Sequence, residues 1–384
     1  MTRYRFDQIA ENSTAKKKPE ESDRNRYVGL EHLDPGTLEV TRWGAEVTPK
    51  GDKLLMKKGD VLFGRRRAYQ KKVGIAPFDG IFSAHGMVLR PKADVVDPMF
   101  FPFFISSDIF LDEAIRVSVG SLSPTANWKD LRTLEFDLPS PGKQRELAGI
   151  LSEAESLKGH YRKLLTTCDD VVKSQFVEMF GEPAENPKGW ETSSLTSLGS
   201  CKNGMNFKSN ESGIELPCLG VGDFKDRSVI NDVSEMGRIN LDDEPAEGYF
   251  LKDGDIVFVR SNGNKELVGR CLAVYPHGEK AVFSGFCIRL RVESDKVRIP
   301  YLIWALKQPS MRQQMFGRGA NVQNLNQKLM AKVDVPIPPL AEQDRFLALV
   351  SIVDKSKFAV QKALDELNAT TKKILNQELG LGDV

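Results

Sequence analysis

The chain has 384 residues, of which 40% are hydrophobic and 28% charged, and its formal net charge at pH 7 is +1. Such a length exceeds what one ordinary hydrophobic core supports, so we expect two or more domains. The near-zero net charge excludes a uniformly basic nucleic-acid coat but leaves room for local basic patches. The first residues contain no apolar signal segment, and no apolar run reaches about 18 residues, which predicts a cytoplasmic protein without a membrane span.

A concentration of positive charge surrounds one of the short strands that the sequence predicts, DVLF (60–63). Residues 52–72 contain eight Lys or Arg and two Asp. In a nearly neutral chain such clustering is typical of a surface that faces a polyanion, although a solvated basic face is the alternative. We therefore expect DNA contacts from the basic and aromatic side chains of this loop: Arg65, Arg66, Arg67, Tyr69, Lys71 and Lys72.

Two later segments of the first half add polar side chains, FSAHGMVLR (82–90) and GSLSPTANWKDL (120–131). The first also contains a histidine, but the matching position later in the chain is Phe286, which argues against catalysis. The expected DNA contacts of these segments are Ser83, His85, Ser121, Ser123, Thr125 and Asn127.

A long helix is predicted over residues 143–180. Its apolar residues alternate spacings of three and four, as the a and d positions of a heptad repeat do. Pro141 precedes the pattern and Gly181 follows it, as start and stop signals do. The expected seam of this helix consists of Leu147, Ile150, Ala154, Leu157, Tyr161, Leu164, Cys168 and Val171.

The second half contains a similar strand in GDIVFVRSNGNKELVG (254–269), but different residues follow this strand than follow DVLF. Later the second half contains the amide-rich stretch NVQNLNQ (321–327). Asn and Gln can bind adenine through paired hydrogen bonds, whereas Arg suits guanine, although amide clusters also occur in ordinary turns. The expected DNA contacts of this half are Lys208, Arg260, Ser261, Asn262, Asn264, Lys265, Ser284, Asn321, Gln323, Asn324 and Asn326.

Five blocks recur in the same order in both halves, which indicates a tandem duplication of about 190 residues. The second long helix repeats the apolar pattern, so the two helices most simply cover each other, although two unrelated core helices are the alternative. The predicted fold class is α+β: two domains of mixed β-sheet with short helices, separated by two long helices that form an antiparallel coiled coil with pseudo-twofold symmetry. The expected second seam is Phe346, Leu349, Val353, Ser356, Val360, Ala363, Leu367 and Thr370. The predicted domains are 1–142, the helix 143–186, 187–337 and the helix 338–384.

The motifs of common nucleic-acid enzymes do not occur in the sequence. There is no GxxxxGK[ST] phosphate loop, no GxGxxG after a strand, and no Asn/Asp-Pro-Pro-aromatic loop of a base-amino methyltransferase. The four histidines lie far apart, and the five cysteines show no CxxC spacing. We therefore predict no catalytic residue and no metal site in this chain.

The ordered duplication resembles the DNA-specificity (S) subunit of type I restriction-modification enzymes. The resemblance lies in GDVLFGRRRAYQKKVGIA with FSAHGMVLR, in GDIVFVRSNGNKELVG with FSGFCIRLR, in a P-x-P motif followed by Gln at each long helix, and in GWE at 189–191. It implies two target-recognition domains that read a bipartite, asymmetric site in double-stranded DNA. It also implies two methyltransferase (M) subunits and motor-nuclease (R) subunits as partners. The chain itself would bind no cofactor, whereas S-adenosylmethionine, ATP and Mg²⁺ would belong to the partners.

Three alternatives remain open at this point. The chain could be the specificity subunit of a two-gene restriction enzyme whose partner fuses methyltransferase and nuclease, which co-purifying subunits would distinguish. A stand-alone DNA-modifying enzyme is disfavoured by the missing motifs, and methyl transfer or cleavage by the isolated chain would support it. A coiled-coil scaffold without DNA affinity would leave the unlike loops of the two halves unexplained.

Overall fold

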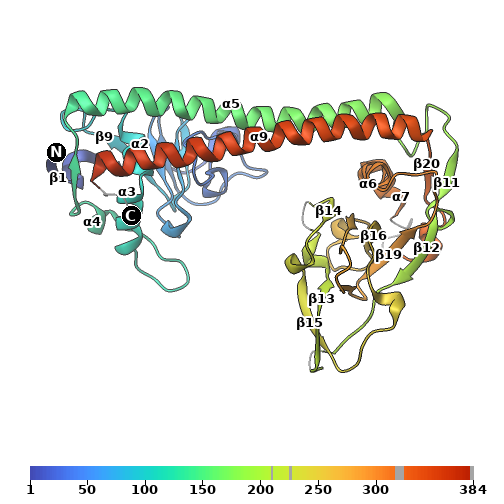
Figure 1. Ribbon diagram of the computed structural model, residues 1–384. Coiled ribbons are helices and arrows are strands. Elements are labelled where there is room, and N and C mark those ends of the chain that lie inside the picture. The colour runs from blue at the N-terminus through green and yellow to red at the C-terminus, as the bar shows by residue number, and fades with distance from the viewer. Residues whose placement is uncertain (209–210, 225–226, 316–323, 381–384) are drawn as a thin grey trace. The chain divides into compact units, whose positions relative to one another are not determined.

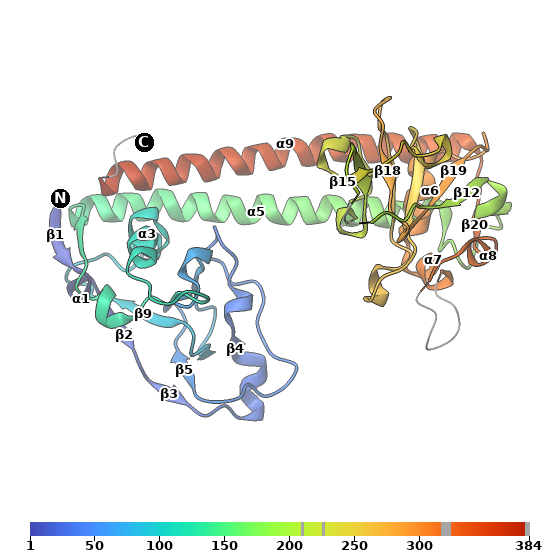
Figure 2. The same ribbon diagram turned by 90° about the horizontal axis from the view of Figure 1, so that it is seen from below.

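The computed structural model describes residues 1–208, 211–224, 227–315 and 324–380, except for the side chain of Lys265. The chain divides into two compact units, of which unit 1 comprises Met1–Thr166 and Lys357–Val384 and unit 2 comprises Thr167–Ser356. Each unit combines small β-sheets with parts of the two long helices, α5 (Pro141–Phe180) and α9 (Leu340–Leu379), as Figures 1 and 2 show. Because this division runs through both helices, the domain boundaries expected from the sequence stay a prediction.

Unit 1 contains three small sheets with the strand orders β2-β9-β6-β7, β3-β5-β8-β4 and β1-β10. Strands β4 and β8 run parallel, and the other pairs are antiparallel. The strands are β1 (Thr2–Arg5), β2 (Ala10–Ser13), β3 (Lys16–Lys17), β4 (Tyr27–Val28), β5 (Lys53–Met56), β6 (Val61–Phe63), β7 (Val73–Ile75), β8 (Gly80–Phe82), β9 (Met87–Pro91) and β10 (Glu135–Leu138).

Unit 2 repeats this plan with the strand orders β12-β19-β16-β17-β14, β15-β13-β18 and β11-β20. The parallel pair β13 and β18 corresponds to β4 and β8, so the duplication and the mixed sheets predicted from the sequence are confirmed. The strands are β11 (Thr192–Ser194), β12 (Gly199–Asn203), β13 (Ile214–Leu219), β14 (Val229–Ile230), β15 (Gly237–Leu241), β16 (Asp255–Val259), β17 (Cys271–Val274), β18 (Val282–Phe283), β19 (Cys287–Val292) and β20 (Asp334–Pro336).

Short helices complete the hydrophobic core of each unit. In unit 1, Phe104 and Phe110 pack with Phe6 and Phe136, and Leu147 and Leu151 of α5 join the same cluster. In unit 2, Phe176 and Phe180 of α5 pack against Tyr301 and Phe346. The short helices are α1 (Phe6–Ile9), α2 (Phe101–Ser106), α3 (Asp108–Arg116) and α4 (Trp128–Leu131) in unit 1, and α6 (Ile299–Lys307), α7 (Pro309–Gln314) and α8 (Gln327–Met330) in unit 2.

The repeated Gly-Asp and Leu-Arg pairs of the sequence form the same ion pair in both units. In unit 1, Arg90 Nε and Nη2 donate to the two carboxylate oxygens of Asp60 at 2.8 and 2.9 Å. In unit 2, Arg291 does the same with Asp255 at 2.8 and 2.7 Å. Both aspartates are buried, and each also accepts a backbone N–H three residues upstream. These contacts join β6 to its neighbour β9, and β16 to β19.

A buried glutamine anchors the start of each long helix. Gln144 donates to Pro139 O at 2.9 Å and accepts from the backbone N–H of Asp97 at 2.7 Å. Gln343 makes the corresponding contacts with Pro338 O at 2.7 Å and with the N–H of Arg298 at 2.8 Å. The glutamine of the P-x-P motif therefore fixes each long helix to the loop in front of α2 or α6.

The predicted helix seam is wrong by one residue along much of α5. Ile150, Leu157 and Leu164, which were expected inside, are 46%, 40% and 44% exposed. The buried face in unit 1 contains Leu151 and Lys158 instead. On α9, the expected seam residues Ser356 and Thr370 are exposed, whereas Leu364 and Thr371 are buried.

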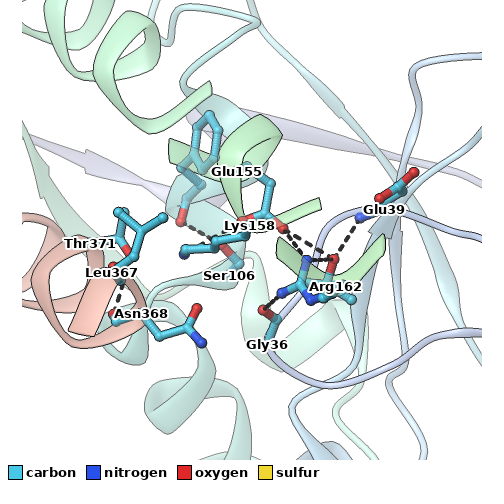
Figure 3. A network of polar contacts seen from close by, with 11 residues as sticks. Gly36, Glu39, Ser106, Glu155, Lys158, Arg162, Leu367, Asn368 and Thr371 are labelled. Atoms are coloured by element: carbon cyan, nitrogen blue, oxygen red, sulfur yellow. Dashed lines mark hydrogen bonds and ion pairs between the residues drawn. The ribbon is translucent and has the colours of Figure 1, made fainter. Parts of the chain in front are cut away.

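A polar network around the buried Lys158 in unit 1 gives the physical reason for this difference (Figure 3). Lys158 Nζ lies 3.5 Å from Glu155, and Arg162 reaches the same carboxylate at 3.5 Å. Glu155 also accepts from the Thr37 hydroxyl at 3.1 Å, and Arg162 donates to Gly36 O at 3.4 Å. Charged residues that satisfy one another can occupy a buried helix face, which an apolar repeat does not reveal.

No helix in the described part of the chain is long and apolar enough to cross a membrane.

The ion pair of unit 2 gives the first prediction. Asp255→Asn removes the buried carboxylate that pairs with the half-buried guanidinium of Arg291, so we expect the free energy of unfolding to fall by about 3 kcal/mol. Urea unfolding of the full chain measures this change. Asp255→Leu combined with Arg291→Met should recover part of the loss, because the guanidinium of Arg291 is removed together with its counter-charge. The recovery stays partial, since the buried Arg289, whose Nη1 lies 4.0 Å from Asp255, still loses a neighbouring negative charge. The control is Asp243→Asn at an exposed position. Equal stability of Asp255→Asn and this control would contradict a structural role for the pair.

Candidate nucleic-acid interface

Three segments that lie far apart in the sequence meet at one end of β6 and β9 in unit 1. The backbone N–H of Arg66 donates to His85 O at 3.2 Å, that of Arg67 to Pro124 O at 2.7 Å, and that of Ala126 to Arg65 O at 3.0 Å. We call residues 65–67, 83–86 and 124–127 the unit-1 loop cluster. The structure thus brings together most of the residues that the sequence singled out in the first half.

The basic loop turns outward through two left-handed residues. Arg67 has φ +56° and Lys71 has φ +50°, and the single 3-10 turn Ala68–Gln70 lies between them. The left-handed region is unfavourable for residues with a side chain, so contacts on both sides must hold the loop. The buried Ala68 side chain provides one such contact. Arg66, Arg67 and Tyr69 are exposed as a result.

Hydrogen bonds orient the side chains within the unit-1 loop cluster. Arg65 donates to Asn127 Oδ1 at 3.4 Å, and Arg66 Nη1 lies 3.4 Å from His85 Nε2. Burial lowers the pKa of His85, and the positive charges of Arg66, Arg65 and Lys53 lower it further. Since a guanidinium can only donate, His85 accepts through Nε2 and is neutral near pH 7.

Three other expected contacts of the first half are already engaged within unit 1. Lys71 Nζ pairs with Asp108 at 2.9 Å and Asp112 at 2.7 Å, and Lys72 Nζ donates to Leu30 O at 2.7 Å. Ser83 is buried, and its hydroxyl accepts from the backbone N–H of His85. We therefore remove Lys71, Lys72 and Ser83 from the proposed DNA contacts, because each side chain already serves the fold.

The loop 119–125 carries the other polar residues expected in unit 1. Backbone N–H groups of Val119 and Thr125 donate to each other's carbonyl oxygens at 3.1 and 3.0 Å, which closes the loop. Ser121 is exposed, whereas Ser123, Thr125 and Asn127 are half-buried. Leu122 at the tip is 91% exposed, and no sequence signal had marked it.

Unit 2 repeats this meeting of three segments. Backbone N–H groups of Arg260 and Ser261 donate to Phe286 O at 2.8 and 3.2 Å, and that of Leu325 donates to Arg260 O at 2.8 Å. We call residues 260–262, 284–286 and 324–326 the unit-2 loop cluster. Gly204 approaches this cluster so closely that an added Cβ would lie 2.0 Å from Ser284 O. A side chain there would displace the turn.

Several polar side chains of unit 2 stabilise local turns. Ser284 is buried and accepts from the N–H of Phe286, and Asn326 Oδ1 caps α8 by accepting from the N–H of Leu329. Arg260 Nη1 donates to Gly285 O at 3.2 Å. Asn262 and Asn264 each accept a backbone N–H two residues downstream through Oδ1. Ser284 and Asn326 are therefore removed from the proposed contacts.

The other expected contacts of unit 2 are exposed, half-buried or outside the residues that the structure describes. Lys208 and Asn324 are exposed, and Ser261 and Asn262 are half-buried beside a cavity of about 510 Å³. Asn321, Gln323 and the side chain of Lys265 lie outside the described residues.

The same cavity is lined by Phe207, Arg238 and Phe286. No sequence signal marked Phe207 or Arg238, and Phe286 entered only as the counterpart of His85. The sequence did contain a signal for Phe286, because this aromatic residue replaces the polar His85 at the corresponding position of the first half.

Metal-ligating and nucleophilic groups do not gather at either loop cluster. Within the ranges that the structure describes, no group of three or more His, Cys, Asp or Glu could hold a metal ion. Burial raises the pKa of Cys201 to about 11 and that of Cys271 to about 12, so neither thiol forms a ready nucleophile near pH 7.

Comparisons with known proteins agree on one family. The family model of the type I restriction modification DNA specificity domain matches residues 4–163 and 187–377. The chain is 26% identical over 355 residues to the type I restriction enzyme StySPI specificity subunit of Salmonella potsdam, covering 86% of this chain and 74% of that protein. It is 25% identical over 362 residues to the EcoKI specificity subunit of Escherichia coli strain K12, with the same coverage of 86% and 74%.

Solved structures show the same fold. One is a chain from a structure on complex assembly and conformational transition of the type I R-M system, with a TM-score of 0.62 and 19% identity over 99% of this chain and 98% of that chain. Another is the type I restriction-modification S subunit from M. genitalium, with a TM-score of 0.52 and 16% identity over 100% and 96%.

The left-handed Arg67 gives the second prediction. Arg67→Gly and Arg67→Ala remove the same charge, but glycine adopts positive φ freely, so we expect the glycine variant to be about 1 kcal/mol more stable than the alanine variant. Both should bind DNA equally weakly. Thermal unfolding and DNA titration measure the two properties. The same pair at Arg66, which is not left-handed, should reverse the order of stability. A glycine variant no more stable than alanine at position 67 would contradict the left-handed conformation.

Proposed function

Because the chain belongs to the family of type I restriction modification DNA specificity domains, we propose that it reads a bipartite, asymmetric DNA site, one half with each unit. It is a DNA-recognition subunit of the type I restriction-modification kind. The proposal of a bipartite site rests on the two loop clusters. They share one arrangement of backbone hydrogen bonds and differ in their exposed side chains.

The unit-1 loop cluster and the loop beside it expose positively charged side chains that suit DNA binding. Arg66 and Arg67 are exposed at the outward loop, and Tyr69 accompanies them. Arginine contacts phosphate groups through charge-assisted hydrogen bonds and guanine through O6 and N7. In this proposal Arg66 and Arg67 carry most of the affinity of unit 1.

The unit-2 loop cluster offers fewer free charges. Ser261, Asn262 and Asn324 present hydroxyl and amide groups, and Phe286 presents an aromatic ring. Such groups suit base edges better than phosphates. The two units would therefore recognise unlike half-sites.

The remaining parts of the proposal follow from the family. The chain would be non-catalytic and cytoplasmic, and would act with two methyltransferase subunits that bind S-adenosylmethionine. Restriction subunits would bring ATP and Mg²⁺. The long helices α5 and α9 would form an antiparallel coiled coil that separates the two recognition domains. Co-purification of a separate ATPase subunit distinguishes this assembly from a fused two-gene enzyme.

The exposed arginines give the third prediction. Arg66→Glu with Arg67→Glu should weaken binding to the recognised duplex and reduce the slope of log K against log salt by about two, since each lost phosphate contact reduces it by about one. The control is Lys57→Glu with Lys58→Glu, two exposed lysines of the same basic run that precede β6, whereas Arg66 and Arg67 follow it. Equal slopes for both double variants would place the loop away from the DNA backbone.

The proposal that each unit recognises its own half-site gives the fourth prediction. Replacing residues 187–337 by the corresponding domain of another family member should alter one half of the methylated sequence and leave the other half unchanged. Methylome sequencing of cells that carry the hybrid chain with its partner subunits measures both halves. The control is the hybrid that replaces residues 1–142, which should alter the opposite half. A change in both halves of the site from either hybrid would contradict independent reading.

A further inference from the structure

The turn Ser284–Phe286 presents an exposed aromatic ring on a fixed backbone. The N–H of Phe286 donates to Ser284 Oγ at 3.3 Å, and Phe286 O accepts from the N–H groups of Arg260 and Ser261. Phe286 is nevertheless 62% exposed. An exposed phenyl group contributes little to the stability of the free protein, and on this fixed backbone it is available to a binding partner.

A cavity of about 510 Å³ lies beside this ring. It is lined by two aromatic residues, Phe207 and Phe286, and by the polar residues Arg238, Ser261 and Asn262. Asn262 Oδ1 already accepts from the N–H of Asn264, so the Nδ2 group of Asn262 remains as a donor. The cavity therefore combines an apolar wall with a hydrogen-bond donor.

Unit 1 has a smaller cavity, of about 360 Å³, at the equivalent turn. His85 is held as Phe286 is: its N–H donates to Ser83 Oγ at 3.3 Å, and its carbonyl accepts from Arg66. Lys50 and Lys53 line this cavity. The duplicated scaffold thus preserves the turn and changes the one side chain that projects from it. The same turn therefore presents an imidazole in unit 1 and a phenyl ring in unit 2.

We infer that Phe286 is a specificity-determining residue that contacts the 5-methyl group of a thymine in the half-site read by unit 2, an inference that rests on the proposed function. In the major groove of DNA the thymine methyl is the apolar group that a side chain can reach, and the O4 acceptor of the same base lies next to it. Phe286 supplies the apolar contact, and Asn262 Nδ2 supplies the donor for O4. The pair distinguishes thymine from cytosine, which presents an amino donor and no methyl group.

The test uses the complete complex of the chain with its partner methyltransferase subunits and duplexes that carry the recognised site. Each thymine of the unit-2 half-site is replaced in turn by deoxyuridine, which lacks only the 5-methyl group. At one position we expect the wild-type affinity to fall about fourfold, the change that corresponds to about 0.8 kcal/mol for one buried methyl group. Phe286→Ala should bind the thymine and deoxyuridine duplexes with equal affinity.

Phe358→Ala is the matched control, because Phe358 is 75% exposed on α9 and lines neither cavity. This variant should keep the fourfold preference for thymine. The inference is overturned if Phe286→Ala still prefers the thymine duplex over the deoxyuridine duplex. This holds whether the overall affinity is unchanged or falls by the same factor for both duplexes. A wild-type complex that binds its site specifically but is insensitive to every deoxyuridine also overturns the inference. A wild-type complex that does not prefer its site over scrambled DNA overturns the proposed function itself.

Discussion

The ion pair between a buried aspartate and an arginine of the neighbouring strand is the interaction on which both loop clusters depend. Asp60 with Arg90, and Asp255 with Arg291, join neighbouring strands at the end where the first strand begins. The exposed loops leave from the other end, where β6 runs into Arg65–Arg67 and β9 starts after the turn of Ser83. A bidentate pair fixes both the spacing and the register of the two strands, so the loops they carry meet at defined positions.

Stability and recognition are thereby assigned to different residues. Backbone hydrogen bonds hold each loop cluster together, such as Leu325 N–H to Arg260 O in unit 2 and Ala126 N–H to Arg65 O in unit 1. Backbone contacts are largely independent of side-chain identity, so exposed positions such as 85 and 286 can change without loss of the scaffold. In the proposed function, the same physical division would permit two copies of one fold to recognise different sequences.

The sequence predicted the duplication, the short strands and the polar segments that follow them, because strand repeats and turn residues are local signals. It did not predict the face of α5, since the charge pairs of Glu155 with Lys158 and Arg162 along the helix do not reveal that Lys158 becomes buried. The contacts with Thr37 and Gly36 come from a distant part of the sequence. It also assigned Lys71 to DNA, although two aspartates of α3 bind it. Charge counts along the sequence cannot distinguish a lysine that faces solvent from one that faces a carboxylate of another element.

The same limit applies to the polar residues of the turns. Ser83, Ser284 and Asn326 satisfy backbone N–H groups and are thus part of the scaffold. Serine and asparagine are common both in turns and in base contacts, so residue type alone is ambiguous. A buried serine whose hydroxyl already accepts a backbone N–H, as in Ser83 and Ser284, belongs to the scaffold. Asn262 differs, because its Nδ2 group can still donate although its Oδ1 accepts a backbone N–H. The exposed side chains of the loop clusters include the cations of Arg66 and Arg67 in unit 1, and the amide of Asn324 and the ring of Phe286 in unit 2. The charged loop would dominate long-range attraction, and the neutral loop would act at contact distance.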